Sequence, residues 1–428
     1  MTEPRSNSDT AIANHSGWFY SASTRLLAIS LYFHSIVVLA RIFPSGFIAT
    51  AEVLIIFSVL LCFSWLLIQR SYLSKVPRYI ILNPWIGWML AWFLVMIISL
   101  SWSQSKNWTS WEAVVSIFEY RVLLLIPFII VSIELLQIQL RHYLPIVAIS
   151  AAVGVFSNLG ELIFQEFWPG LLLSKGSHII DASVSGLAIL LAGFYAIRGG
   201  RYRYIYLLIF LGIALSVLLD EGKTGYVIVI MITACFLFFY PSHYRVHAVC
   251  IIFGALLILY SVNSFERSEH ILQRFLQGVS QLYVNDGVSC ADTESTLTRI
   301  CFYFHGVRAV TDGPWLGYGV LDVAFHLDKI VDFPNNRVTD NLHNEFIQQF
   351  LILGVAAAPL IFFFYREIFF WIWSASENKE FKFLAVSFVL LILSGMAFNS
   401  TLKDFGEKNL YTVAIVSIFL LRRKWGAR

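Results

Sequence analysis

Apolar segments of about 20 residues recur along the whole of this chain, and they limit its possible folds more than any other feature. A helix of that length spans the hydrocarbon core of a bilayer, which is about 30 Å thick. Only 13% of the 428 residues are charged, whereas a soluble domain carries about 25%. Because this deficit extends over the whole chain, apolar surface must face lipid. We therefore expect an all-α polytopic membrane protein.

Twelve segments are apolar enough to be spans, and they lie near residues 24–41, 51–69, 79–101, 113–133, 143–164, 179–197, 204–220, 223–240, 244–262, 345–365, 382–399 and 408–422. They divide the chain into a tail (1–23), spans one to nine (24–262), a long loop (263–342), spans ten to twelve (343–422) and a second tail (423–428). The first tail lacks the features of a signal peptide, so we expect the apolar segments to be retained as anchors.

Lysine and arginine are unevenly distributed between the two sides of the predicted membrane. If the N-terminus is cytoplasmic, seventeen of the 30 lie in cytoplasmic segments and six lie in short outer loops. Cytoplasmic loops carry the excess of positive charge in membrane proteins. Both termini are therefore expected in the cytoplasm, with the loop 263–342 on the outer side of the membrane.

The long loop contains amphipathic stretches and no low-complexity linker. Its segment STLTRICFYFHGVRAVTDGP begins with Ser/Thr and ends in Gly-Pro, which predicts a helix between those signals. A partly helical cap is the simplest interpretation. Cys290 and Cys301 also lie here, where a disulfide is permitted, with two free thiols as the alternative. No CxxC motif or histidine cluster accompanies them, so we expect no metal site.

The strongest candidate for chemistry is the sequence DNLHNEFIQQFLILG, where the loop enters the tenth span. His343 and Asn344 stand at that junction, and polar groups at the ends of spans are functional candidates. Gly354 follows eleven residues after His343, about three helical turns, so we expect it under His343 on one helix face. The alternative is a polar helix cap with His343 solvated.

The predicted loop helix carries two arginines. Arg299 has Tyr303 one turn later on its own face. Arg308 is nine residues from Arg299, about half a turn round a straight helix, so the two arginines cannot enter one pocket. The helix is followed by the turn-rich segment PWLGYG, which could equally be an ordinary chain reversal.

Two further cations lie at or within spans. Lys223, in LLDEGKTGY, stands where a helix is expected to begin, and a lysine beside a helix N-terminus suits an anion. Neutralisation by Asp220 or Glu221 is the alternative. Arg121 lies inside the fourth predicted span, where a charge is costly and often functional. It could instead pair structurally with a carboxylate such as Asp181.

Together these segments resemble the O-antigen ligase family of bacterial envelope enzymes. The matching features are His343-Asn344 followed after nine residues by Gly354, Arg299 with its aromatic one turn later, the PWLGYG segment, and Arg121 with Leu125. The layout matches over nearly the whole chain. Two positions depart from the family: Lys223 stands where arginine is usual, which keeps the charge but loses the bidentate fork, and Ala357 replaces a second glycine.

The resemblance implies a metal-independent glycosyltransferase without a cofactor. It would move a glycan from undecaprenyl pyrophosphate onto lipid A–core at the periplasmic face, in lipopolysaccharide biosynthesis. Lys223 and Arg299 would stabilise the leaving pyrophosphate, and His343 would accept the proton of the acceptor hydroxyl. These three are the catalytic candidates. The substrate-binding candidates are Arg121, Asn344, Tyr303 and Arg308. No basic cluster suggests a nucleic-acid partner.

Other functions remain open at this point. A glycan polymerase that uses the same lipid-linked donor shares the layout and much of the pattern. A transporter would be expected to have inverted repeats and broken helices at mid-bilayer, whereas the polar candidates here gather at the outer face. A purely structural membrane protein would have no reason to combine His343, Arg299 and Lys223.

The charge distribution makes a testable prediction of topology. A periplasm-dependent reporter inserted within residues 280–295 should be active, because the loop 263–342 is expected outside the membrane. A cytoplasm-dependent reporter at the same site should be silent, and activity of that second reporter would overturn the orientation.

Overall fold

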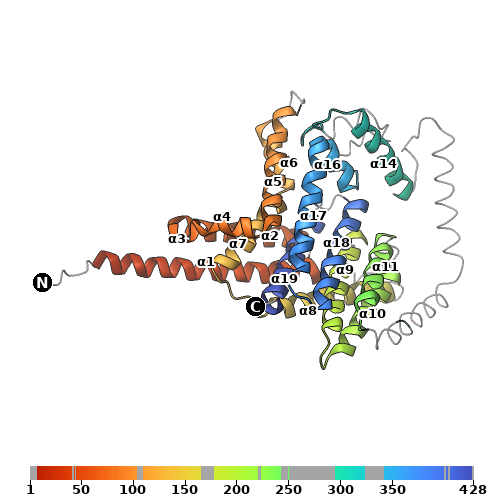
Figure 1. The fold of residues 1–428 in the computed structure, drawn as a ribbon, viewed down its shortest axis with the longest axis horizontal. Coiled ribbons are helices and arrows are strands. Elements are labelled where there is room, and N and C mark those ends of the chain that lie inside the picture. The colour runs from red at the N-terminus through yellow and green to blue at the C-terminus, as the bar shows by residue number, and fades with distance from the viewer. Residues whose placement is uncertain are drawn as a thin grey trace. The chain divides into compact units, whose positions relative to one another are not determined.

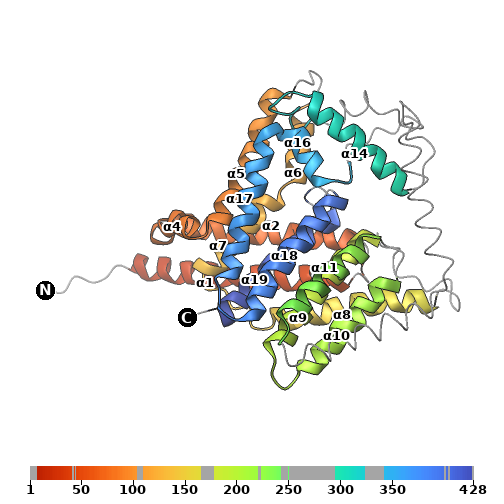
Figure 2. The ribbon, with the colours of Figure 1, turned by 45° about the vertical axis from the view of Figure 1, so that its right-hand side comes forward.

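The computed structural model describes residues 7–40, 43, 45–103, 109–164, 178–219, 223–241, 249, 295–322, 342–399, 402 and 405–426. Every regular element in these ranges is a helix (Figures 1 and 2). The predicted all-α class is therefore confirmed for this part of the chain. The chain divides into two compact units, which are described separately below.

Among the described residues, five helices are long and apolar enough to cross a membrane: Gly17–Ala40, Gly46–Ile68, Pro84–Trp102, Glu345–Trp373 and Lys379–Phe398. A sixth is possible if the broken pair Ser110–Glu119 and Val122–Leu135 forms one span. Shorter apolar helices coincide with four other predicted spans. The segment 244–262 lies outside the described residues apart from residue 249, so the count of twelve stays a prediction.

The first unit comprises Met1–Gly87, Val122–Gly176 and Asn409–Arg428. Its helices are α1 (Asn7–Ala40), α2 (Ser45–Ile68), α3 (Arg70–Leu73), α4 (Lys75–Leu82), α7 (Val122–Leu135), α8 (Tyr143–Phe164) and most of α19 (Phe405–Trp425). Helix α1 packs against α2 and α8. A Cβ atom at Gly154 of α8 would lie 2.1 Å from the carbonyl oxygen of Leu39, so glycine permits the close approach of α8 to α1.

Hydrogen bonds between buried polar side chains join the helices of this unit. The Nε2 atom of His34 lies 2.8 Å from Oδ1 of Asn409, and the hydroxyls of Ser30 and Ser58 lie 2.8 Å apart. Interhelical hydrogen bonds of this kind help membrane helices to associate, because lipid is as apolar as the side chains it contacts.

The second unit comprises Trp88–Arg121 and Ser177–Lys408. Its elements are the rest of α5 (Pro84–Ser99), η1 (Leu100–Trp102), α6 (Ser110–Glu119), α9 (His178–Arg198), α10 (Arg203–Leu219), α11 (Lys223–Phe239), α14 (Ser295–Asp312), α16 (Glu345–Leu353), η3 (Gly354–Ala356), α17 (Ala357–Trp373) and α18 (Lys379–Phe398). Helix α14 matches the helix predicted within the long loop, with its end just before Gly313-Pro314. That this helix belongs to a cap over the membrane core stays a prediction.

Helices α9, α10, α11 and α18 pack together, as Figure 2 shows. Phe210 and Phe236 stack with centroids 4.4 Å apart, and Phe236 meets the edge of Phe383 at 6.1 Å. The hydroxyl of Ser394 on α18 lies 3.4 Å from the sulfur of Met231 on α11. The order of the contacts is reversed along the two chains, since Met231 meets Ser394 and the later Phe236 meets the earlier Phe383. Helices α11 and α18 are therefore antiparallel. The first residue of α11 therefore lies toward the C-terminal end of α18.

The PWLGYG segment caps the end of α16 and is more than an ordinary reversal. The last carbonyls of a helix lack partners within the helix. Here the amide of Tyr318 donates to the carbonyl of Leu351 at 2.7 Å, and the amide of Gly319 donates to that of Ile352 at 3.0 Å. In return, the amide of Val355 donates to the carbonyl of Trp315 at 2.9 Å.

Gly354 ends α16 with a φ of +58°, so the expectation that it lies beneath His343 on one continuous helix is wrong. Helix α16 ends at this residue because amides of the PWLGYG segment bond to the last carbonyls of the helix. A Cβ atom at Gly354 would lie 2.0 Å from the carbonyl oxygen of Trp315. The glycine thus admits the PWLGYG segment against the end of α16.

Replacing Gly354 by alanine should destabilise the second unit by about 1–3 kcal/mol, because a left-handed backbone is strained for residues other than glycine, and the clash with Trp315 adds to this. A lowered melting temperature of the purified protein in detergent would show it. Gly212→Ala on α10 is the matched control: no atom lies within 4 Å of its Cβ, so its melting temperature should not fall. Equal melting temperatures for the two variants would contradict this account.

Candidate functional site

His343 occupies a tight turn directly before α16. Its backbone has a φ of +51°, an uncommon conformation for a residue other than glycine that points to a local constraint. The ring is half-buried: its Nδ1 atom lies 3.0 Å from Oδ1 of Asn399, and its plane is nearly parallel to that of Phe302, with centroids 6.5 Å apart. His343 is therefore held in place by the protein, which disfavours the alternative of a merely solvated cap.

Asn344 is the N-cap of α16. Its Oδ1 atom accepts a hydrogen bond from the amide of Ile347 at 3.0 Å, as asparagine typically does at this position. Its Nδ2 atom donates to the carbonyl of Ala397 at 2.9 Å. Both ends of the side-chain amide bond to the protein itself, which favours a positioning role for Asn344 over direct contact with a substrate.

Tyr303 on α14 reaches the same turn. Its hydroxyl lies 2.9 Å from the carbonyl oxygen of His343 and 3.1 Å from that of Ala397. Burial raises the pKa of Tyr303, and the positive charge of Arg299 opposes that increase in part. Because the pKa is raised, the hydroxyl keeps its proton and remains a donor at neutral pH. Arg299, half-buried one turn before Tyr303, shares this face of α14.

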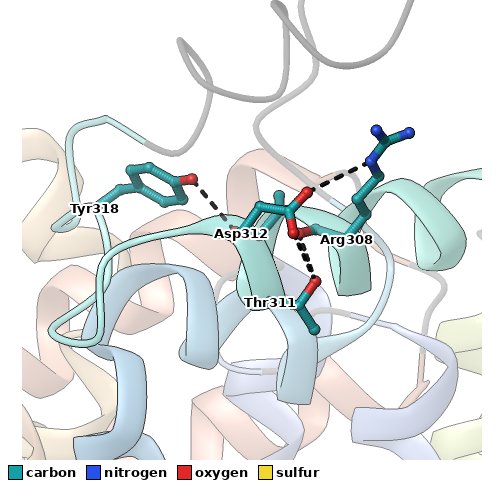
Figure 3. A network of polar contacts seen from close by, with 5 residues as sticks. Arg308, Thr311, Asp312 and Tyr318 are labelled. Carbon is teal, nitrogen blue, oxygen red and sulfur yellow. Dashed lines mark hydrogen bonds and ion pairs between the residues drawn. The ribbon is translucent and has the colours of Figure 1, made fainter.

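Arg308 pairs with Asp312 one turn later on α14, as Figure 3 shows. Its side chain is 65% exposed, and its Nε atom is 3.5 Å from the carboxylate of Asp312. The hydroxyl of Tyr318, in the PWLGYG segment, donates to the carbonyl of Ala309 at 3.3 Å and so links that segment to α14. The structure brings Tyr303 to His343 and Arg299 near Tyr303, whereas Arg308 pairs with Asp312.

Lys223 and Arg121 come from elements other than α14 and α16. Lys223 is the first residue of α11, as the sequence predicted; its side chain is not among the described ones. Arg121 lies in the two-residue break between α6 and α7. These helices together could form one bent span, so its predicted place inside a span stays a prediction. Its Nη1 atom donates to the carbonyl of Phe118 at 2.8 Å. A helix end leaves that carbonyl available to a cation. The side chain of Asp181, its suggested partner, lies outside the described residues.

A buried carboxylate beside the site went unnoticed in the sequence. Glu345 is fully buried, and its Oε2 atom accepts from the amide of Leu402 at 2.9 Å. Its Oε1 atom accepts from Nε2 of Gln349 at 2.6 Å, whose Oε1 atom accepts from the indole of Trp92 at 2.9 Å. The spacing of Glu345 and Gln349, four residues apart on an apolar helix, was the available signal. Asn399 offered none, because it is 56 residues from His343.

The chemistry open to this arrangement follows from the histidine. A neutral imidazole with one nitrogen engaged can accept a proton at the other, and the arginine on α14 adds positive charge on the same face. Within the described ranges, no group of three or more His, Cys, Asp or Glu side chains could hold a metal ion. The Cys290–Cys301 pair falls outside the described side chains.

Comparison with known families agrees with this arrangement. Residues 207–364 match the family model described as O-antigen ligase, which confirms the resemblance drawn from the sequence over this range. The match includes Lys223, Arg299, Tyr303, His343 and Gly354. It ends before Asn399 and begins after Arg121. No curated protein matches the chain.

Proposed function

We propose that this protein is a membrane glycosyltransferase of the O-antigen ligase type, which moves a glycan from undecaprenyl pyrophosphate onto lipid A–core at the periplasmic face of the bacterial inner membrane. The observation that carries the proposal is the constrained turn of His343 within the matched region, with one ring nitrogen 3.0 Å from Asn399. The gathering of the described polar groups at one end of α18 favours an enzyme over a transporter with its site at mid-bilayer.

In the proposed reaction, a hydroxyl of lipid A–core attacks the anomeric carbon of the glycan. His343 takes the proton of that hydroxyl as the new C–O bond forms, and it becomes an imidazolium that later loses the proton to water. The bond between the anomeric carbon and the pyrophosphate oxygen breaks, and its electron pair leaves with the lipid pyrophosphate. A positioned general base of this kind contributes about 10²–10⁴-fold to the rate.

The leaving pyrophosphate gains negative charge as that bond breaks, and fixed cations stabilise such charge best where water is scarce. Arg299 is half-buried on the face of α14 that carries Tyr303. Lys223 begins α11, where the positive end of the helix dipole adds to its charge. We assign the pyrophosphate to these two cations. The assignment requires no metal ion.

A deletion strain examined for lipopolysaccharide tests the proposal. Loss of all glycan on lipid A–core, with long glycan still made on the lipid carrier, is expected for a ligase. Core that carries a single repeat unit would identify a polymerase instead. Complementation with His343→Ala should fail, because the base is absent, while complementation with wild type should restore the glycan. Restoration by His343→Ala at matched membrane levels would remove His343 from the mechanism.

The two proposed cations can be tested separately. Lys223→Ala and Arg299→Ala should each cost roughly 1.5–3 kcal/mol of transition-state stabilisation, the range for hydrogen bonds to charged groups. Lys223→Arg should be tolerated, because the charge stays. Arg308→Ala should be mild, because its exposed ion pair contributes at most about 1 kcal/mol. Transfer rates and donor affinities of these four variants decide: an unaffected Lys223→Ala beside an inactive Arg308→Ala would show that the cations are wrongly chosen.

A further inference from the structure

Asn399 is fixed beside His343 by its own backbone. It follows the last residue of α18 in extended conformation, with φ −157° and ψ 167°, a backbone that any residue adopts. Its amide donates to the carbonyl of Gly395 at 2.8 Å, and its carbonyl accepts from the amide of Glu345 at 3.1 Å. Neither bond uses the side chain. The side-chain amide, on a residue only 4% exposed, is therefore free to serve the histidine.

The histidine is fixed from the other side as well. The hydroxyl of Tyr303 lies 2.9 Å from the carbonyl oxygen of His343, and Asn344 donates to the carbonyl of Ala397 at 2.9 Å. With the backbones on both sides held, the contact of 3.0 Å between Nδ1 of His343 and Oδ1 of Asn399 helps to orient the ring, which also lies beside the ring of Phe302.

We propose that Asn399 is the positioning residue of His343: its Oδ1 atom accepts the Nδ1–H proton and so leaves Nε2 as the proton-accepting nitrogen. This inference rests on the proposed function. Neutral imidazole carries one N–H, and an acceptor at one nitrogen keeps the proton there. When Nε2 takes the proton of the acceptor hydroxyl, the ring becomes positive, and the carbonyl dipole of Asn399 stabilises that charge without itself being protonated.

The charges around His343 are compatible with this role. Among the described groups, Tyr303 bonds to the carbonyl of His343, and the charge of Arg299 acts on Tyr303. The carboxylate of Glu345 is bonded to the amide of Leu402 and to Gln349. The described end of α18, from Ala397 to Asn399, carries no ionisable side chain. A neutral amide at Asn399 orients the ring without adding charge, so it does not favour the imidazolium in the resting protein as a carboxylate would.

The test is the pH dependence of transfer by the purified full-length protein, from an undecaprenyl-pyrophosphate-linked glycan to lipid A–core. Asn399→Asp keeps the acceptor oxygen but adds a negative charge, which raises the pKa of His343. The base form is then present only at higher pH, so the acid limb of the kcat profile should move up by about 1–3 pH units, with activity recovered above it. Asn399→Ala should lower kcat roughly 10–100-fold, the range for losing the partner that orients a metal-bound histidine, with little change in the KM of the donor.

Ser394→Ala, one turn earlier on α18, is the matched control, because it removes a buried polar contact of the same helix end without touching His343. Its kcat and pH profile should match wild type. A wild-type profile for Asn399→Asp, or a uniform loss at all pH values, would overturn the positioning role even while His343→Ala is inactive. Full transfer by His343→Ala would instead refute the proposed mechanism itself, so the two failures are distinguishable.

Discussion

The hydrogen bonds of Glu345 are the interaction on which the rest of the site depends. A buried carboxylate is costly unless its oxygens find donors, and here one oxygen binds the amide of Leu402 while the other binds Gln349. The amide of the same residue holds the carbonyl of Asn399. One residue thereby joins the start of α16 to the chain beyond α18. It adds to the bonds of Tyr303 and Asn344 that hold Asn399 and His343 beside each other.

Local signals in the sequence were enough for some of the helix boundaries and for part of the site. The Ser/Thr start and the Gly-Pro stop correctly bounded α14, and Lys223 correctly began α11. The pairing of His343 with Asn344 correctly located a loop-to-helix junction, and Asn344 acts there as the N-cap. Each of these features is decided by residues a few positions apart, which is the range over which capping and helix periodicity act.

The remaining features are decided by contacts between distant segments. Asn399 meets His343 only because α17 and α18 return the chain to its starting end, and no spacing in the sequence records that return. The same reason explains the error at Gly354: periodicity extended one helix through it, whereas the PWLGYG segment takes the last carbonyls of α16 and ends the helix. The break between α6 and α7 at Arg121 was not predicted for a related reason, since no local signal in the sequence reveals it.

The left-handed backbone of His343 has a consequence for how sequences could vary here. Glycine alone adopts this conformation without strain, so a residue with a side chain at this position costs the fold about 1–3 kcal/mol. Selection for folding alone would favour glycine at the turn, so the histidine is present despite its cost in stability. Related chains with glycine at this position would therefore be expected to keep the fold and to lack the activity. That loss could be recognised from this single position in the sequence.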